Sequence, residues 1–374
     1  MILMLFNDNN TTMNVSNIVT DSSEDDDEVL FQHFKKYSKT PLNCRKDINN
    51  IINSIISNDN IEEVNDLKSK MEYLNDVEQP EQRTKEWFDY RHNRVTASAV
   101  SNILGTKSDY KNYLKDKVIP SLNYNIFNSI KACKHGIQFE IIAQKIYEEL
   151  TNTKVGEYGC IPHKTITHLG ASPDGIVIES KDPKLAGRML EIKCLYSRML
   201  TGIPLYKYWV QCQVQLEVCD LDYCDFFECK IDETVSKTVF YKKICNKKQF
   251  YGILIEYTKR SDYPRIHNEY SAITNTKEYY EIWSDYKLDA LINDNDVLSI
   301  TIKYWYLKKY SLKTIHRDKD WFQCIKNSIK NFWNKVLKTK ELIKKFPEKQ
   351  NELFPEKEKK PYEKYPTEYA FIDN

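Results

Sequence analysis

The part of the chain that most constrains its fold is residues 169–194, which contain two short apolar runs separated by a polar connection. The first run, residues 176–178, is entirely β-branched, and the second, residues 189–194, is apolar apart from two charges. The connection carries Pro, Gly and Asp, residues that favour turns. This pattern predicts a β-hairpin with Asp174 at its mouth.

The charged residues of this hairpin suggest a chemistry. Side chains alternate along a strand, so Glu191 and Lys193 are expected on one face and Ile192 on the other. Together with Asp174, the two charged residues could converge at one edge of a sheet. Two carboxylates suit Mg²⁺, which prefers oxygen ligands and which activates water and stabilises phosphoryl charge. An ammonium on the same face can orient the attacking water. The alternative is a solvated strand with two surface charges and a turn aspartate, because motifs this short also match by chance.

The charge of the chain is unevenly distributed. Residues 1–82 contain 16 acidic and 7 basic residues, and since the whole chain has a formal net charge of +1, the remainder carries +10. A basic remainder of this size is typical of a protein with a nucleic-acid partner. No apolar run approaches the length of a membrane span, and residues 1–6 are too short for a signal peptide. We therefore expect an intracellular protein that is not secreted and has no membrane partner.

The ten cysteines are expected to be reduced thiols, as is usual inside cells. Cys219, Cys224 and Cys229 lie at intervals of five, whereas paired zinc ligands normally lie two to four residues apart. An iron–sulfur cluster fits this spacing poorly, because no four-cysteine pattern is matched. Buried core cysteines are the preferred interpretation.

Two segments before the hairpin carry candidate phosphate ligands. Residues 81–91 have a helical pattern, and a second helix is expected between an N-cap at Thr96 and a stop at Gly105. The start of that helix offers free N–H groups to an anion, and Arg91 and Ser98 could contact a phosphate. Taken alone, however, Arg91 fits an ordinary surface ion pair better.

Two further helices are expected on either side of the hairpin. Residues 139–150 carry apolar side chains at helical spacing, with Glu140 beside the stripe at the first turn, where an acidic residue usually complements the helix dipole. Residues 206–219 predict a helix in which Gln211 and Gln215 share a face and Gln213 points elsewhere.

Strands at residues 223–230 and 235–241 are expected to complete a mixed sheet. Beyond residue 260 the chain is aromatic and basic, and residues 325–340 have the pattern of a long amphipathic helix docked on the core. Stacking of these aromatic residues on nucleic-acid bases is the alternative. The tail repeats Phe-Pro-Glu-Lys at residues 346–349 and 354–357, and its composition predicts flexibility.

Taken together, these segments resemble the lambda-exonuclease-like branch of the PD-(D/E)xK nucleases, which includes the YqaJ-type viral recombinases. Five blocks occur in the family's order, and their order is more specific than any single block. The matching residues are Trp87, Arg91 and Thr96-Ala97-Ser98 in the first block, Gly136-Ile137-Gln138-Phe139-Glu140 in the second, Ser172-Pro173-Asp174-Gly175 in the third, Leu190-Glu191-Ile192-Lys193-Cys194 in the fourth and Gln213-Val214-Gln215 in the last.

The resemblance implies roles for individual residues. Metal ions would be held by Asp174, Glu191, Glu140 and the carbonyl of Ile192. Lys193 would position the nucleophilic water, and Gln213 would lie beside the site. A 5′-terminal phosphate would be bound by Arg91, Ser98 and Ser172. Arg198 could add a phosphate contact, although the chain after Cys194 is one residue shorter than the family pattern.

The resemblance also implies the fold class: an α/β (α+β), restriction-endonuclease-like core with a central mixed β-sheet flanked by helices, plus a helical C-terminal extension. We expect an acidic, partly disordered or helical arm at residues 1–80, a nuclease core at residues 81–260, a helical, aromatic and basic region at residues 261–345, and a flexible tail at residues 346–374. Within the arm, helices are expected at residues 29–37, 48–56 and 61–74.

The leading hypothesis is a Mg²⁺-dependent 5′–3′ double-strand DNA exonuclease, with Mn²⁺ as a substitute, that makes single-stranded tails for recombination or repair. In this family such enzymes form rings around DNA ends and work with a single-strand annealing partner. The many Asn, Lys, Ile and Tyr residues suggest an AT-rich genome, here that of a large DNA virus acting in a cytoplasmic viral factory or in the nucleus. The alternatives are a structure-selective or endonucleolytic enzyme of the same family and a non-catalytic DNA-binding module.

Overall fold

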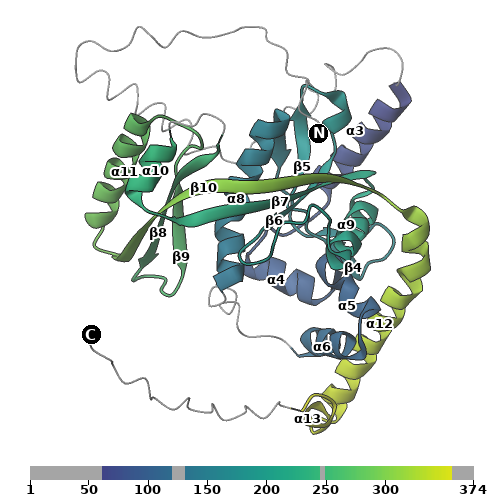
Figure 1. Ribbon diagram of the computed structural model, residues 1–374. Helices are drawn as coiled ribbons and strands as arrows, with labels where there is room; N and C mark the ends of the chain where they lie inside the picture. Colours follow the sequence, from purple (N-terminus) through teal and green to yellow (C-terminus); the bar gives the residue numbers. More distant parts are fainter. Residues whose placement is uncertain (1–60, 120–130, 245–248, 356–374) are drawn as a thin grey trace, which may run out of the picture. The chain divides into compact units, whose positions relative to one another are not determined.

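A computed structural model describes residues 61–119, 131–244 and 249–355 (Figure 1). The helices expected at residues 29–37 and 48–56 lie outside these ranges, as does the end of the tail. The helix expected at residues 61–74 is present as α3, Ile61–Asp76. None of the helices in the described ranges combines the length and the apolar composition needed to span a membrane.

The fold is built on a mixed seven-stranded sheet with the strand order β2-β5-β6-β7-β10-β8-β9. Neighbouring strands are antiparallel except β6 and β7, which are parallel. The predicted hairpin is present as β5 and β6, and the expected mixed α/β fold is confirmed. The strands are β2 Thr153–Gly156, β5 Gly175–Ser180, β6 Met189–Cys194, β7 Tyr223–Val235, β8 Tyr251–Lys259, β9 Ile266–Tyr270 and β10 Val297–His316.

A small second sheet brings two distant segments together. It has the order β1-β4-β3 and consists of Val95–Thr96, Leu169–Ala171 and Ile161–Pro162. Strand β1 is parallel to β4, with Thr96 opposite Gly170. The chain around Thr96 therefore lies beside the chain that leads into the hairpin.

Helices cover both faces of the large sheet (Figure 1). Helix α8, Lys131–Thr151, packs its predicted apolar stripe into a cluster that contains Phe227 of β7. Helix α9, Tyr206–Cys219, lies in a second cluster with Phe226. Because consecutive residues on a strand face opposite sides, α8 and α9 lie on opposite faces of β7.

The remaining helices complete the layers around the sheet. They are α4 Lys85–His92, α5 Val100–Leu104, α6 Lys107–Val118, α10 Lys237–Lys243, α11 Lys277–Ile292, α12 Lys319–Lys345 and α13 Lys349–Leu353, together with the 3₁₀ turns η2 Ala97–Ala99 and η3 Pro183–Leu185. The expected amphipathic C-terminal helix is confirmed as α12, which buries the ring of Phe332 and stacks it on Tyr113 of α6, with ring centroids 4.8 Å apart.

Several expectations for the second half of the chain were wrong. Residues 235–241 were expected as a strand, but most of them belong to α10, Lys237–Lys243, which the Ser236 hydroxyl caps by accepting a hydrogen bond from the Val239 amide. Residues 261–345, expected to be helical, contain the 20-residue strand β10, which pairs with β7 and β8. The expected boundary after residue 260 therefore falls inside one sheet. Helix α13 lies in the tail that was expected to be flexible.

The cysteines behave as core residues. All cysteines in the described ranges are free thiols. Cys219, Cys224 and Cys229 are almost completely shielded from solvent, which confirms the preferred interpretation of their spacing.

Candidate active site

The β5–β6 hairpin brings the three predicted charged residues into one neighbourhood. One carboxylate oxygen of Asp174, Oδ2, accepts a hydrogen bond from the Ile192 amide at 2.6 Å. The Glu191 side chain is completely buried and forms an ion pair with the partly exposed Lys193. The turn is close-packed, since a Cβ on Gly175 would lie 2.1 Å from Cγ1 of Val155. A glycine is therefore needed directly after Asp174.

Helix α8 adds a fourth ionisable group to this neighbourhood. Burial raises the pKa of Glu140, nearby Arg83 and Lys193 oppose this rise, and Glu191 adds to it. Burial likewise raises the pKa of Asp174 well above its ordinary value, and the charges of Glu191 and Glu140 reinforce this effect. The carboxylates predicted from separate blocks therefore lie near enough to one another to influence each other's pKa.

Lys193 carries a firmly held positive charge. Burial alone would lower the pKa of its ammonium, but the nearby charges of Glu191 and Asp174 outweigh burial and raise it. Lys193 therefore stays protonated at neutral pH, and it can donate hydrogen bonds but cannot accept a proton.

The carboxylates have the oxygen donors that bind a metal cation, although they do not surround a metal-binding cavity. Three carboxylates and a backbone carbonyl are oxygen donors of the kind that Mg²⁺ prefers. Within the described ranges, no three His, Cys, Asp or Glu side chains come close enough together to enclose a metal ion. Instead, Lys193 pairs with Glu191, and Arg83 donates to Glu140 at 2.6 Å. Oε1 of Gln215 is buried beside Glu191 without a hydrogen-bond partner in the described part of the chain, a position that suits a cation-bound water.

The glutamine assignment from the resemblance was wrong in position. Gln211 donates to Oε1 of Glu191 at 2.7 Å, and Gln215 donates to Oε2 at 2.8 Å. Gln213 points to the other flank of α9, where it bonds the backbone of His316 and Asp318, both at 2.7 Å. Residues four apart share a helix face and residues two apart do not, so the helical periodicity had already indicated the correct pair.

Three of the four predicted phosphate ligands, Arg91, Ser98 and Ser172, lie together, and we call this cluster the phosphate pocket. Arg91 donates to the hydroxyl of Ser172 at 3.1 Å and to that of Ser98 at 3.3 Å. The indole N–H of Trp87 also donates to Ser172, at 3.1 Å, and the Arg91 guanidinium lies 4.3 Å from the centre of the Trp87 ring. A planar cation held by an aromatic ring and flanked by two hydroxyls is a suitable receptor for a phosphate.

Helix α6 supports this pocket from behind, a feature that the sequence analysis missed. Lys117 is buried and donates to the carbonyl of Arg91 at 2.6 Å, while the Tyr113 hydroxyl accepts from the Thr96 amide at 3.2 Å. Burial, aided by the positive charges of Arg91 and Lys340, lowers the pKa of Lys117 to about 7. The four-residue spacing of Tyr113 and Lys117 puts them on one face of α6, which was the only sequence signal for their shared role.

The structure does not place Arg198 in the phosphate pocket. Its guanidinium forms an ion pair with the buried Glu228, which is opposite Lys193 in the parallel register of β6 and β7. The ring of Tyr208 lies near both cations, 5.7 Å from the Arg198 guanidinium and 5.2 Å from the Lys193 ammonium. Arg198 therefore lies on the Lys193 side of the site.

Known proteins share parts of this chain. It is 35% identical over 188 residues to Uncharacterized protein R354 of Acanthamoeba polyphaga mimivirus, a match that covers 46% of this chain and 34% of that protein, so the chain spans about a third of the relative's length. Among solved structures it is similar to an alkaline exonuclease, LHK-Exo, from Laribacter hongkongensis, with 20% identity, a TM-score of 0.43, and coverage of 71% of this chain and 99% of that chain. It is also similar to a phage-related exonuclease from Haemophilus somnus 129PT, with 13% identity, a TM-score of 0.35, and coverage of 69% of this chain and 98% of that chain.

Residues 86–222 match the model of the YqaJ-like viral recombinase domain. All the predicted site residues lie within this range, so the match is to the part of the chain that carries the candidate active site.

Proposed function

We propose that the protein is a divalent-metal-dependent nuclease that digests double-stranded DNA from 5′-phosphorylated ends, in the 5′ to 3′ direction, and leaves single-stranded tails for recombination or repair. The observation that carries this proposal is a chain of hydrogen bonds that connects the phosphate pocket to the Glu191 carboxylate. Ser172 contributes its hydroxyl to the pocket, and its carbonyl accepts from Gln215, which also donates to Glu191. Asp174 follows two residues later.

This coupling suits attack on a phosphodiester close to a bound chain end. A terminal phosphate held by Arg91 and Ser172 would fix the first nucleotide relative to Asp174 and Glu191. Fixing a substrate in the reactive geometry can account for a large part of an enzyme's rate enhancement. The same pocket supplies a reason for polarity, because only a 5′ end presents a terminal phosphate ahead of the bond to be cleaved.

The residues that would hold Mg²⁺, or Mn²⁺ in its place, are Asp174, Glu191, Glu140 and the carbonyl of Ile192. The chemistry supplied there is activation of water and stabilisation of phosphoryl charge. The charges of Glu191 and Asp174 raise the pKa of Lys193, so its role would be to orient the water and to offset negative charge that develops on the phosphate. Gln211 and Gln215 keep the Glu191 carboxylate in one orientation, as hydrogen-bonded neighbours of metal ligands commonly do.

The test compares linear duplexes that carry a 5′-phosphate or a 5′-hydroxyl, in Mg²⁺. We expect the native protein to degrade the phosphorylated duplex faster and to leave closed circular DNA intact. Lys193→Ala should lose activity on both duplexes by about 10²–10³-fold, the usual effect of removing a group that stabilises developing charge. Arg91→Met should mainly remove the preference for the phosphorylated end. Equal digestion by native and Lys193→Ala protein, or cleavage of closed circles, would refute the proposal.

The viral relative supports a viral setting for this activity. A ring-shaped oligomer, a single-strand annealing partner and the compartment in the host stay predictions of the resemblance. Size measurement by light scattering, with and without a DNA end, tests the first of these.

A further inference from the structure

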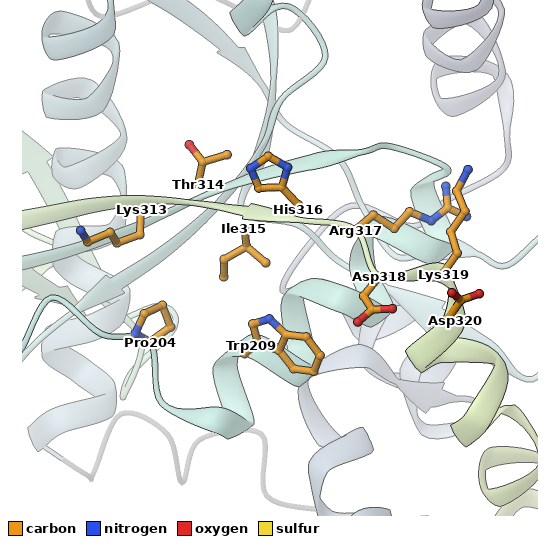
Figure 2. Close-up of a pocket in the computed structure, with 10 residues that line it drawn as sticks. All are labelled: Pro204, Trp209, Lys313, Thr314, Ile315, His316, Arg317, Asp318, Lys319 and Asp320. Carbon is orange, nitrogen blue, oxygen red and sulfur yellow. The ribbon is translucent and has the colours of Figure 1, made fainter.

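A pocket of about 900 Å³ lies where β10 ends and α12 begins (Figure 2). Its lining includes Trp209 from the first turn of α9, and Lys313, His316 and Lys319 from the chain around the β10–α12 junction. The lining residues 313–320 all lie beyond residue 222, where the family match ends. Arg91, Ser98 and Ser172 are not among the residues that line this pocket.

Trp209 gives the pocket a fixed aromatic wall. Its ring is half-buried and forms a T-shaped pair with the ring of Trp321, with centroids 4.9 Å apart. It is nearly parallel to the ring of Tyr206, with centroids 6.1 Å apart. The Tyr206 side chain is 62% exposed. In Figure 2 the Trp209 ring lies below Ile315 and beside Asp318. A ring held in this way can accept a planar group without further loss of side-chain freedom.

The pocket also carries two lysines for which the described ranges show no ion pair. Lys313 and Lys319 are exposed, and neither has a carboxylate within 4.0 Å in the described part of the chain. In contrast, Arg317 is neutralised by Glu217 at 2.7 Å and Asp220 at 2.8 Å. Asp318 caps α12 by accepting from the Trp321 amide at 2.9 Å, which leaves Asp320 as the other acidic residue of the lining. The lining therefore offers two ammonium groups to a polyanion.

The pocket lies close to the candidate active site but on the other flank of α9. Gln211 and Gln215 of α9 face Glu191, whereas Trp209 and Gln213 face the β10–α12 junction. In the large sheet, Glu191 pairs with Phe226 and Phe226 pairs with Lys313, so all three lie on one face. Neighbouring strands are about 4.8 Å apart, which separates the backbones of Glu191 and Lys313 by about 10 Å. The candidate active site and the pocket are therefore about two strand spacings apart, on opposite flanks of α9.

We infer that this pocket binds unpaired nucleotides of the single-stranded tail, with a base on Trp209 and backbone phosphates at Lys313 and Lys319. An aromatic platform combined with nearby cations is the usual means of binding single strands without sequence preference. Single-stranded DNA fits better than a duplex, because only an unpaired base exposes its face to a ring inside a pocket. This inference rests on the proposed nuclease function, which supplies the single strand beside the pocket.

The first experiment measures binding of a fluorescein-labelled oligo(dT) by anisotropy in chelator, where no cleavage occurs. Trp209→Ala should weaken binding by about 5- to 150-fold, the loss expected for one base–aromatic stack. Trp209→Phe, which keeps a ring, should retain most of the affinity. Tyr263→Ala, which removes an exposed ring in the β8–β9 connection, serves as the control and should not change it. The affinity of the protein for a blunt duplex should change little with any of these substitutions.

The lysines are tested through the salt dependence of the same binding. The double change Lys313→Gln and Lys319→Gln should lower the slope of log affinity against log salt by about 1.4, since each phosphate contact to a single strand contributes about 0.7. Lys335→Gln and Lys338→Gln, on the outer face of α12, are the matched controls. An unchanged slope in the first pair, or an equal change in the controls, would refute the assignment of the phosphates.

A crosslinking experiment covers the case in which Trp209→Ala does not fold. A duplex with a 3′ overhang containing 5-iododeoxyuridine is irradiated with Lys193→Ala protein, and the crosslinked peptide is identified by mass spectrometry. Crosslinks to Trp209 or His316 support the inference, whereas crosslinks confined to other surfaces refute it. If native protein digests phosphorylated duplex but the overhang never reaches the pocket, the inference alone fails. If the pocket binds single strands but no duplex is cleaved, the proposed function fails.

Discussion

Replacing Lys117 by methionine tests the support of the phosphate pocket by helix α6. Lys117 is only 6% exposed, and its pKa is lowered from 10.5 to about 7. Below pH 7 both the folded and the unfolded chain carry the proton, so the folded state bears the full cost of the buried charge. Between pH 7 and 10.5 the folded protein has released the proton and the unfolded chain still holds it. The free energy of unfolding therefore rises with pH in this window.

The size of the effect follows from the same two values. Each pH unit in the window contributes about 1.4 kcal/mol, so the native protein should gain roughly 3 kcal/mol of stability from this group between pH 6 and pH 9. Lys117→Met lacks this dependence. It also leaves the Arg91 carbonyl without its donor, which costs about 1–3 kcal/mol at every pH. The variant should therefore lose most stability, relative to the native protein, at pH 9.

The assay is urea unfolding of both proteins at pH 6 and pH 9, followed by tryptophan fluorescence. Lys111→Met, an exposed position on the same helix, is the control and should follow the native protein at both pH values. If native and Lys117→Met proteins change in parallel between pH 6 and pH 9, Lys117 does not titrate in this range and the reasoning is wrong.

Three further predictions concern the site and the helices around it. Gln211→Leu and Gln215→Leu should each lower the rate of duplex degradation by about 10- to 100-fold, as loss of a hydrogen-bonded neighbour of a metal ligand does. Gln213→Leu should leave the rate per folded molecule nearly unchanged. Degradation assays at equal concentrations of folded protein check both expectations. Mg²⁺ should raise the melting temperature of the native protein in a concentration-dependent way, and Asp174→Asn should remove most of this rise, as measured by differential scanning fluorimetry. Phe332→Ala should reduce the free energy of unfolding by about 3–5 kcal/mol, because the ring is buried and stacked on Tyr113, and urea titration measures the loss.

The hairpin and the helices around it were predictable because their signals are local. The spacing of Asp174, Glu191 and Lys193 depends on one turn and on alternation along one strand, and α9 has the same bounds in the structure as in the sequence pattern. The meeting of Arg91, Ser98 and Ser172 came from the family resemblance, since no local pattern joins residues so far apart in the sequence.

Strand β10 was missed because its identity depends on partners elsewhere in the chain. Its sequence mixes Tyr, Ile and Lys, a composition that also fits a surface helix. Only the pairing of β10 with β7 and β8 distinguishes the two structures. The Gln213 error had a different origin: block order in the family was given more weight than helical periodicity. Lys117 and Tyr113 carried no recognisable motif, because their role depends on contacts to the backbone of another segment.

The position of β10 has a consequence for how the chain is made. Strand β7 ends at Val235, but the neighbour that covers it begins only at Val297. During synthesis the hydrogen-bonding groups along that edge stay unpaired until about 80 further residues have left the ribosome. An uncovered strand of this kind is a template for pairing with other chains. A fragment that stops at residue 222, where the family match ends, would lack β7 as well and would leave the edge of β6 uncovered permanently. The matched segment therefore depends on later parts of the chain to complete its sheet.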